Sequence, residues 1–325
     1  MTRTIPHVML VGPYGGQCGI GQYAEYWRES LFATNDDLKV HTETDLHPNV
    51  VLERSKLPPV IVLNYQAALL SQWHPSHIFE VQSRGSKVLT IWHDSGVPNS
   101  DHCKLICEAS DHFVLHEPYD DLTPNGTYLR QGIPSWEDPV KFWLLKQEMN
   151  RTERWWGEQP IVGTVGLTMG YRNVDLLCRA AHLAGWGVLV LASRATDQEV
   201  TDWTALNPAC HVVRDFLPKE DVVSYLAGCD ATAQLVVTNN AGTSGGIRQC
   251  LAARKSLIAF RSRQFRDLER EPAIHWLDDG SVEAVADALE HSDLWPRLPI
   301  IRLAARDSWL NASKVYANII RDLLA

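Results

Sequence analysis

The order of apolar and helix-like segments constrains the fold of this chain more than any other feature of its sequence. Short apolar runs, typical of strands buried on both faces of a parallel sheet, recur as HVMLVG, PVIVLNY, KVLTIWH, HFVLH, IVGTVG, GVLVLAS, HVVRDF, ATAQLVV and SLIAF. Helical patterns such as GQYAEYWRESLFA and KEDVVSYLAGC lie between most of them. This alternation predicts βαβ units and therefore doubly wound parallel sheets of the α/β class.

The series of strands and helices restarts near residue 160, after the polar segment KQEMNRTERWWGEQP, which has the composition of a linker. The chain has 325 residues, enough for two domains of ordinary size. We therefore expect two Rossmann-like domains that face each other across a cleft, the first at 1–153 and the second beginning at residue 154.

Composition and charge narrow the classes of partner. Hydrophobic residues make up 45% of the chain and charged residues 21%, which is typical of globular proteins. No apolar run reaches the ~18 residues of a membrane span, and the seven cysteines have no regular spacing, so we expect a cytoplasmic protein without an integral membrane span. Residues 1–150 carry 11 Lys and Arg against 18 Asp and Glu, and this acidic balance disfavours polyanions as partners of the first domain.

Ligands of open α/β sheets bind beyond the carboxyl ends of the strands, so the loops that follow strands are the candidate sites. The first such loop contains five glycines: Gly12, Gly15, Gly16, Gly19 and Gly21. Their spacing does not match the dinucleotide fingerprint G-x-G-x-x-G. The glycines either form only a tight turn or let the backbone approach a ligand.

His93 and Asp94 directly follow the apolar strand VLTIW and precede a Gly-x-Pro sequence. A buried histidine beside a polar group is often structural, but this pair lies at a strand's carboxyl end, where sites occur. We therefore interpret it as functional.

The third loop, Thr243 to Gly246, lies between a strand and a helix. Free amides at a helix start, two glycines and two hydroxyls together predict an anion site that suits a diphosphate. The alternative is a helix capped by Ser or Thr, which needs no ligand.

Two further clusters are weaker. One comprises His93, His102, Cys103, Cys107, His112 and His116, whose spacing matches no common zinc pattern, so we expect no metal site. The other comprises Arg261, Arg263, Arg266 and Arg270, which form either a solvated face or a contact for an anionic substrate.

The order of the motifs resembles the retaining GT-B glycosyltransferases, most closely the large family 4 of sugar-nucleotide-dependent enzymes. The similar segments span nearly the whole chain: GGQCGIGQYAEYWRESL, VLTIWHDSGVP, SDHFVLHEPYDDL with LRQGIP, IVGTVGLTMGYRNVDLLCRAA, RDFLPKEDVVSYLAGCDATAQL, GTSGGIRQCLAARKSLIA, IHWLDDGSVEAVADALEHS and DSWLNASKVYANIIRDLL. The resemblance implies an acceptor-side domain at 1–153, a nucleotide-sugar-binding domain at 154–303, and a helix at 304–325 that returns toward the first domain.

The resemblance also implies a hexosyl- or pentosyltransferase that moves a sugar from a nucleoside diphosphate, of UDP or GDP type, to an acceptor hydroxyl with retention and without a metal. The residues that it places at the reaction centre are His93, Asp94 and Arg172. The residues that it places against the donor are Gly15, Gly16, Gly19, Arg172, Asn240, Thr243, Ser244, Gly245, Gly246 and Gln249.

The chain departs from the family pattern at the donor positions. The family's two glutamates fall near Ala241, beside Asn240, and at Gln249, which can bind a hydroxyl only without charge assistance. Leu167 stands where the family has an arginine, and Arg172 lies near its lysine.

These departures leave several functions open. The leading one is transfer to a glycan, a lipid-linked or a small-molecule acceptor. A second is transfer to a modified base of duplex DNA, as in viral GT-B enzymes, which the arginine run and twelve tryptophans would serve. A third is a catalytically silent sugar-nucleotide-binding protein, and a fourth is a GT-B enzyme other than a transferase, such as an epimerase.

Overall fold

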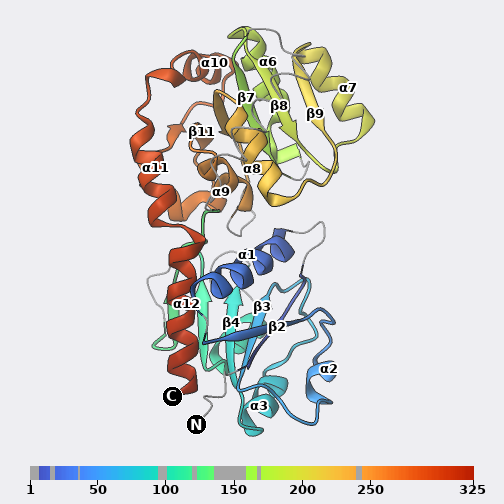
Figure 1. Ribbon diagram of the computed structural model, residues 1–325. Coiled ribbons are helices and arrows are strands. Elements are labelled where there is room, and N and C mark those ends of the chain that lie inside the picture. The colour runs from blue at the N-terminus through green and yellow to red at the C-terminus, as the bar shows by residue number, and fades with distance from the viewer. Residues whose placement is uncertain are drawn as a thin grey trace. The chain divides into compact units, whose positions relative to one another are not determined.

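The computed structural model describes residues 7–14, 19–35, 37–93, 101–118, 123–134, 159–166, 170–238 and 244–325. It contains two parallel six-stranded sheets, each in its own compact unit. The first unit comprises the chain up to Gly132 together with Asp307–Ala325, and the second lies between Ile133 and Arg306 (Figure 1). Within the described residues, no helix combines the length and the apolar character needed to cross a membrane.

The sheet of the first unit has the strand order β2-β1-β3-β4-β5-β6. Its strands are β1 (His7–Val11), β2 (Lys39–Glu43), β3 (Val60–Tyr65), β4 (Lys87–Trp92), β5 (His112–Leu115) and β6 (Gly126–Tyr128). The helices of this unit are α1 (Gly19–Thr34), α2 (Pro48–Leu52), α3 (Pro75–Ser83), α4 (Asp101–Ala109) and α12 (Trp309–Leu324).

The sheet of the second unit has the strand order β12-β11-β10-β7-β8-β9. Its strands are β7 (Ile161–Val165), β8 (Gly187–Leu191), β9 (Cys210–Val213), β10 (Ala231–Gln234), β11 (Ser256–Phe260) and β12 (His275–Leu277). Its described α-helices are α6 (Val174–Leu183), α7 (Asp197–Leu206), α8 (Lys219–Gly228), α9 (Gly245–Ala252), α10 (Val282–Glu290) and α11 (Arg297–Arg306), and its described 3-10 helices are η1 (Gly170–Arg172), η2 (Arg263–Leu268) and η3 (Ser292–Leu294).

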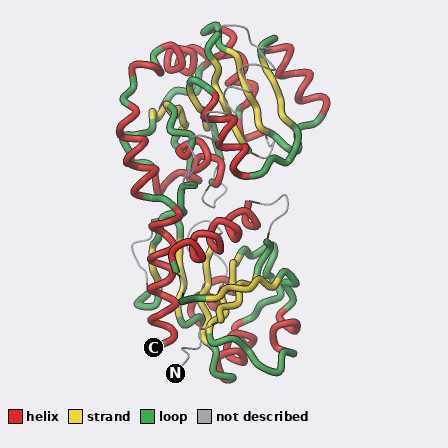
Figure 2. The backbone as a smooth tube through the Cα atoms, viewed as in Figure 1, coloured by secondary structure: helices red, strands yellow, loops and turns green. Residues whose placement is uncertain are grey.

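Burial on both faces explains why the central strands are apolar runs. In β1, Val8 and Leu10 belong to one hydrophobic cluster, while Met9 and Val11 belong to another on the opposite face. Helices flank the sheets (Figure 2), so neither set of side chains meets water. The predicted doubly wound α/β fold is confirmed.

The sequence patterns missed three of the four strands at the sheet edges. The strands β2, β6 and β12 are sheet edges, and all but one of their residues are exposed or only partly buried, so they lack an apolar run. Our description of the segment HVVRDF as fully buried was wrong, because β9 is also an edge strand and all four of its residues are partly exposed.

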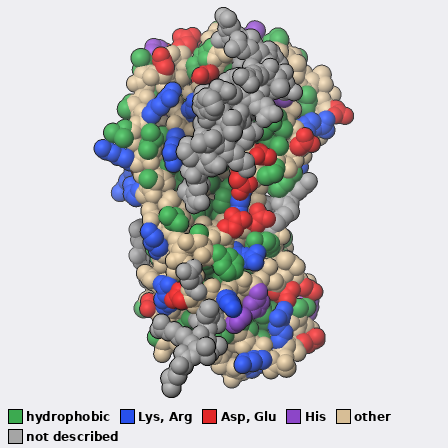
Figure 3. All heavy atoms as spheres, viewed as in Figure 1, with side chains coloured by type: hydrophobic (Ala, Val, Ile, Leu, Met, Phe, Trp, Pro, Cys, Tyr) green, Lys and Arg blue, Asp and Glu red, His purple; other side chains and the backbone are tan. Residues whose placement is uncertain are grey.

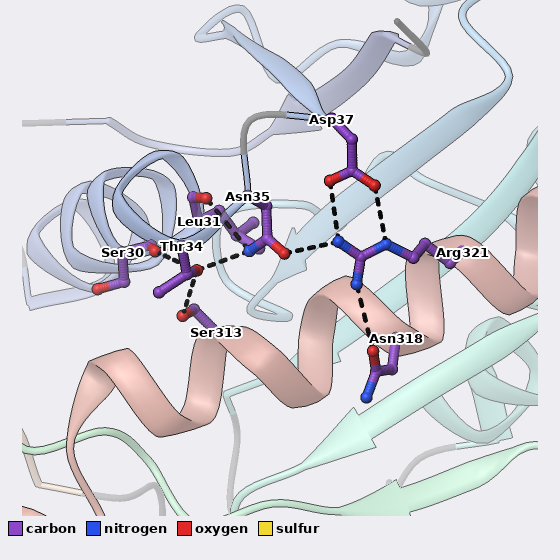
Figure 4. A network of polar contacts seen from close by, with 8 residues as sticks. All are labelled: Ser30, Leu31, Thr34, Asn35, Asp37, Ser313, Asn318 and Arg321. Atoms are coloured by element: carbon purple, nitrogen blue, oxygen red, sulfur yellow. Dashed lines mark hydrogen bonds and ion pairs between the residues drawn. The ribbon is translucent and has the colours of Figure 1, made fainter.

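The helix α12 is packed into the unit formed by the start of the chain, against α1. Figure 4 shows polar contacts of α12 with the end of α1 and with the residues just after it: Thr34 Oγ1 lies 3.0 Å from Ser313 Oγ, and Arg321 donates to both carboxylate oxygens of Asp37 and to Asn35. The hydroxyls of Tyr23 and Tyr316 form a buried hydrogen bond of 2.6 Å. The last helix therefore completes the first unit's core.

Replacing one member of this tyrosine pair should destabilise the first unit more than replacing both. Tyr316→Phe leaves the buried Tyr23 hydroxyl without its partner, at a cost of about 1–3 kcal/mol. In Tyr23→Phe/Tyr316→Phe, no hydroxyl is left unpaired. Urea unfolding of the two single variants and the double variant measures the coupling, and additive losses would contradict this account.

Candidate functional site

The carboxyl edge of the first sheet gathers polar side chains from two adjacent strands. Asn64 of β3 pairs with Ile91 of β4 in the strand register, and the His93 N–H donates to the Tyr65 carbonyl at 3.0 Å. Because residues two apart on a strand share a face, His93 projects on the side of Asn64. The His93 Nε2 atom lies 2.5 Å from Asn64 Oδ1.

Two aromatic rings pack against the partly buried His93. The Tyr23 ring of α1 meets it edge-on at 4.3 Å between ring centroids, and His116, just after β5, lies at 5.5 Å. Burial and, to a lesser extent, His116 hold the pKa of His93 well below its ordinary value. The imidazole is therefore neutral at pH 7 and acts as a hydrogen-bonding group and not as a cation.

In the second sheet, the carbonyl oxygen of Val165, the last residue of β7, is a meeting point of three elements. It accepts hydrogen bonds from Arg172 Nη1 at 3.2 Å and from Gln234 Nε2 at 3.0 Å. A Cβ placed on Gly246 of α9 would lie 3.0 Å from the same oxygen. The predicted donor residues Arg172 and Gly246 are thus brought together at one strand end.

Gly166 allows the arginine to lie where it does. Its φ of +147° is rarely adopted by other residues, and a Cβ there would overlap the Arg172 guanidinium. Asn173, which follows Arg172, is left-handed (φ 49°), a conformation that asparagine tolerates, and its amide donates to the Leu235 carbonyl at 2.8 Å. Asparagine is one of the few residues other than glycine that adopt this conformation readily.

The first turn of α9 offers backbone amides at the same edge. Ser244 is the N-cap residue and is buried, but its side chain makes no capping hydrogen bond. In α7, α10 and α12 the N-cap side chain does accept from the first turn. Serine capping, the alternative to an anion site, is therefore not formed by Ser244.

Sequence reasoning missed a buried ion pair beneath this turn. Arg248 of α9 and Asp267 of η2 form an ion pair with both side chains 2% exposed. The Ser244 N–H also donates to the Gln264 carbonyl of η2 at 3.4 Å. The sequence did contain one signal of this pair, because Arg248 stands in a helix whose other residues suggest burial. The pair ties η2 to the first turn of α9.

The structure describes some of the remaining predicted residues, and the others lie outside the described part of the chain. Gly19 is the first residue of α1, and a Cβ added at Gly19 or at Gly245 would meet no heavy atom within 4 Å, so local packing does not require glycine at either position. Gln249 is 8% exposed. The other predicted positions lie outside the described residues: Gly15, Gly16, Asp94, Leu167, Asn240, Ala241 and Thr243.

The protein should lose stability in mild acid through His93. The folded-state pKa lies below the ordinary value of about 6.5, so the unfolded chain binds more protons below that pH and stability falls as pH drops. His93→Gln should weaken this loss between about pH 7 and pH 5, as measured by urea unfolding.

His291→Gln is the matched control, because this exposed histidine has a raised pKa and the opposite sign of linkage. An unchanged pH profile in His93→Gln would contradict a neutral buried imidazole.

Replacing Gly166 should displace Arg172. Gly166→Ala combines an unfavourable φ with overlap of the guanidinium, and we expect it to cost at least about 1–3 kcal/mol in unfolding free energy. Gly170→Ala is the control, because no heavy atom lies within 4 Å of its Cβ position. Equal stability of the two variants would show that the Gly166 contact is not needed.

No protein-family model matches the chain, and no curated protein matches its sequence. Solved structures do match its fold. The structure of Anabaena HepE in complex with UDP and glucose has a TM-score of 0.70 at 10% identity, covering 98% of this chain and 100% of that chain.

Two other structures match at similar length. The N-terminal domain of Candida albicans trehalose-6-phosphate phosphatase has a TM-score of 0.71 at 8% identity, covering 100% of this chain and 97% of that one. The UDP-forming trehalose-phosphate synthase of Burkholderia xenovorans has a TM-score of 0.62 at 10% identity, with 95% and 81% covered. Identities this low establish only the fold: the chain has a two-domain, GT-B-like architecture that it shares with HepE, whose structure is also known in complex with UDP-glucose.

Proposed function

We propose that the protein is a glycosyltransferase that moves a sugar from a nucleoside-diphosphate donor to an acceptor hydroxyl and retains the anomeric configuration. The observation that carries the proposal is the convergence of Arg172, Gly246 and the first turn of α9, whose N-cap side chain Ser244 makes no capping hydrogen bond, on the carboxyl end of β7. This convergence occurs in a fold shared with a HepE complex that contains UDP-glucose. We therefore propose UDP as the donor nucleotide, with GDP as the alternative. We also propose that the protein is a divergent relative of the family 4 enzymes.

The chemistry requires stabilisation of a departing anion. As the bond to the sugar breaks, negative charge accumulates on the leaving diphosphate, and preorganised donors aimed at that charge lower the barrier. Arg172 supplies a fixed positive charge, and the amides of Gly245 and Gly246 add the positive end of the helix dipole. We propose that these groups stabilise the negative charge of the leaving diphosphate without a metal ion.

We propose that the first unit binds the acceptor and also supplies His93 to the donor sugar. The neutral His93 contacts the donor sugar as a hydrogen-bonding partner, with Asp94 beside it in the chain. A neutral imidazole suits this role, because the transferred sugar becomes electron-poor as the donor bond breaks and a nearby cation would oppose that change. The acceptor itself is proposed only by class, as a glycan, a lipid-linked sugar or a small molecule with a free hydroxyl.

Arg172→Met should weaken UDP binding about 10- to 100-fold, because a charge-assisted hydrogen bond contributes about 1.5–3 kcal/mol. Titration calorimetry with UDP measures the change. Arg179→Met is the matched control, because it removes an exposed arginine from the following helix, α6. Equal affinities of the two variants would remove Arg172 from the donor site.

Two alternatives are separated by simple outcomes. A silent sugar-nucleotide binder, suggested by Gln249 in place of the family's glutamate, would bind UDP-sugars without hydrolysing or transferring them.

A DNA acceptor is favoured by α11, which carries Arg297 and Arg302 on its exposed side and no acidic residue. In Figure 3, basic side chains lie among hydrophobic ones around this helix. Salt-dependent binding of duplex DNA that Arg302→Gln weakens would support that acceptor.

A further inference from the structure

Asn64 is a fully buried polar residue at the carboxyl end of a core strand, and its amide orientation is determined by its neighbours. The Asn64 Nδ2 group donates to the Ile20 carbonyl of α1 at 3.3 Å. A flipped amide would instead place its oxygen against that carbonyl oxygen, which is repulsive. The Oδ1 atom therefore faces His93.

This orientation determines which nitrogen of His93 carries the proton. The Oδ1 atom can only accept, and it lies 2.5 Å from His93 Nε2, so Nε2 must be the protonated nitrogen. In a neutral imidazole the other nitrogen, Nδ1, is then an acceptor. Among the described residues, Asn64 is the one side chain that forms a hydrogen bond with the ring.

The groups packed around the ring favour the neutral state. They are Tyr23 from α1, with Tyr316 of α12 bonded behind it, and His116 after β5. None of these is an anion at neutral pH, because burial raises the pKa of both tyrosines. Asn64 itself is an uncharged acceptor where an aspartate would stabilise the imidazolium.

Gly12 makes room for Asn64. A Cβ at Gly12, directly after β1, would lie 2.7 Å from the Asn64 Cβ, closer than two carbon atoms pack. This close approach explains why the first residue of the glycine-rich loop is a glycine. It lets the chain pass close enough to β3 for α1 and Asn64 to meet.

We propose that Asn64 is a positioning residue that holds His93 in the Nε2–H tautomer, so that Nδ1 accepts a hydrogen bond from a sugar hydroxyl. The inference rests on the proposed function for the identity of the substrate. It predicts discrimination by chemistry: a donor sugar with a hydroxyl at the contacted position is bound, whereas a carboxylate or carbonyl there, which has no proton to donate, is rejected.

The tautomer is measured directly in the native protein. Long-range ¹H–¹⁵N spectra of the imidazoles, with His93 assigned through His93→Gln, should show a protonated Nε2 and an unprotonated Nδ1 at neutral pH. A proton on Nδ1, or a charged ring, overturns the proposal. This readout does not depend on transferase activity, so its failure is distinct from failure of the proposed function.

Variants of Asn64 should alter this state in defined ways. Asn64→Asp, which is nearly isosteric, should move the titration of His93 to higher pH and shift the acid limb of the UDP-sugar turnover profile with it. Asn64→Leu should lower kcat about tenfold, the loss of roughly one hydrogen bond, while UDP affinity stays unchanged. An unchanged titration in Asn64→Asp overturns the inference.

Asn207→Leu is the matched control. Asn207 is equally buried, in the second unit, where its amide bonds to the Trp186 carbonyl and the Ala209 N–H, both at 2.9 Å. Its loss should lower stability without changing the His93 spectrum or the pH profile. If Asn207→Leu altered the His93 spectrum or the pH profile, the effect of the Asn64 variants would be ordinary destabilisation, and the proposal would be wrong.

Discussion

The parallel pairing of all strands is the constraint on which the rest of this structure depends. In a parallel sheet both faces are covered and all carboxyl ends meet at one edge, so polar residues after successive strands become neighbours. His93 and Asn64 meet in this way at the ends of β4 and β3, and Arg172 and Gln234 meet at Val165 of β7. The topology of each unit therefore determines which polar groups meet at its sheet edge.

The two polar clusters are built by opposite electrostatic rules. Around His93, burial and uncharged neighbours keep the ring neutral, so it can only exchange hydrogen bonds. Around Val165, the Arg172 guanidinium and the first turn of α9 concentrate positive potential at one strand end. A neutral site suits a sugar and a positive site suits a diphosphate, which is the physical basis for proposing a sugar-nucleotide donor.

Three glycines allow the close approaches on which these clusters depend. Gly12 admits Asn64, Gly166 admits the Arg172 guanidinium, and Gly246 admits the Val165 carbonyl. From the sequence alone, these three closely packed glycines could not be distinguished from Gly19 or Gly245. A Cβ added at Gly19 or Gly245 would meet no heavy atom within 4 Å. Glycine in a loop predicts a special position, but only the neighbouring atoms show which kind it is.

By itself, the sequence determined the α/β class, the central strands and the loops that follow them, because burial on both faces leaves a local apolar pattern. It also singled out His93, Arg172 and the start of α9. Only the tertiary structure decided the edge strands β2, β6 and β12, whose exposed faces erase that pattern. It also decided the pairings Asn64–His93, Arg248–Asp267 and Tyr23–Tyr316. Those pairings join residues of different elements, and no local pattern records which partner on another element a buried polar group will meet.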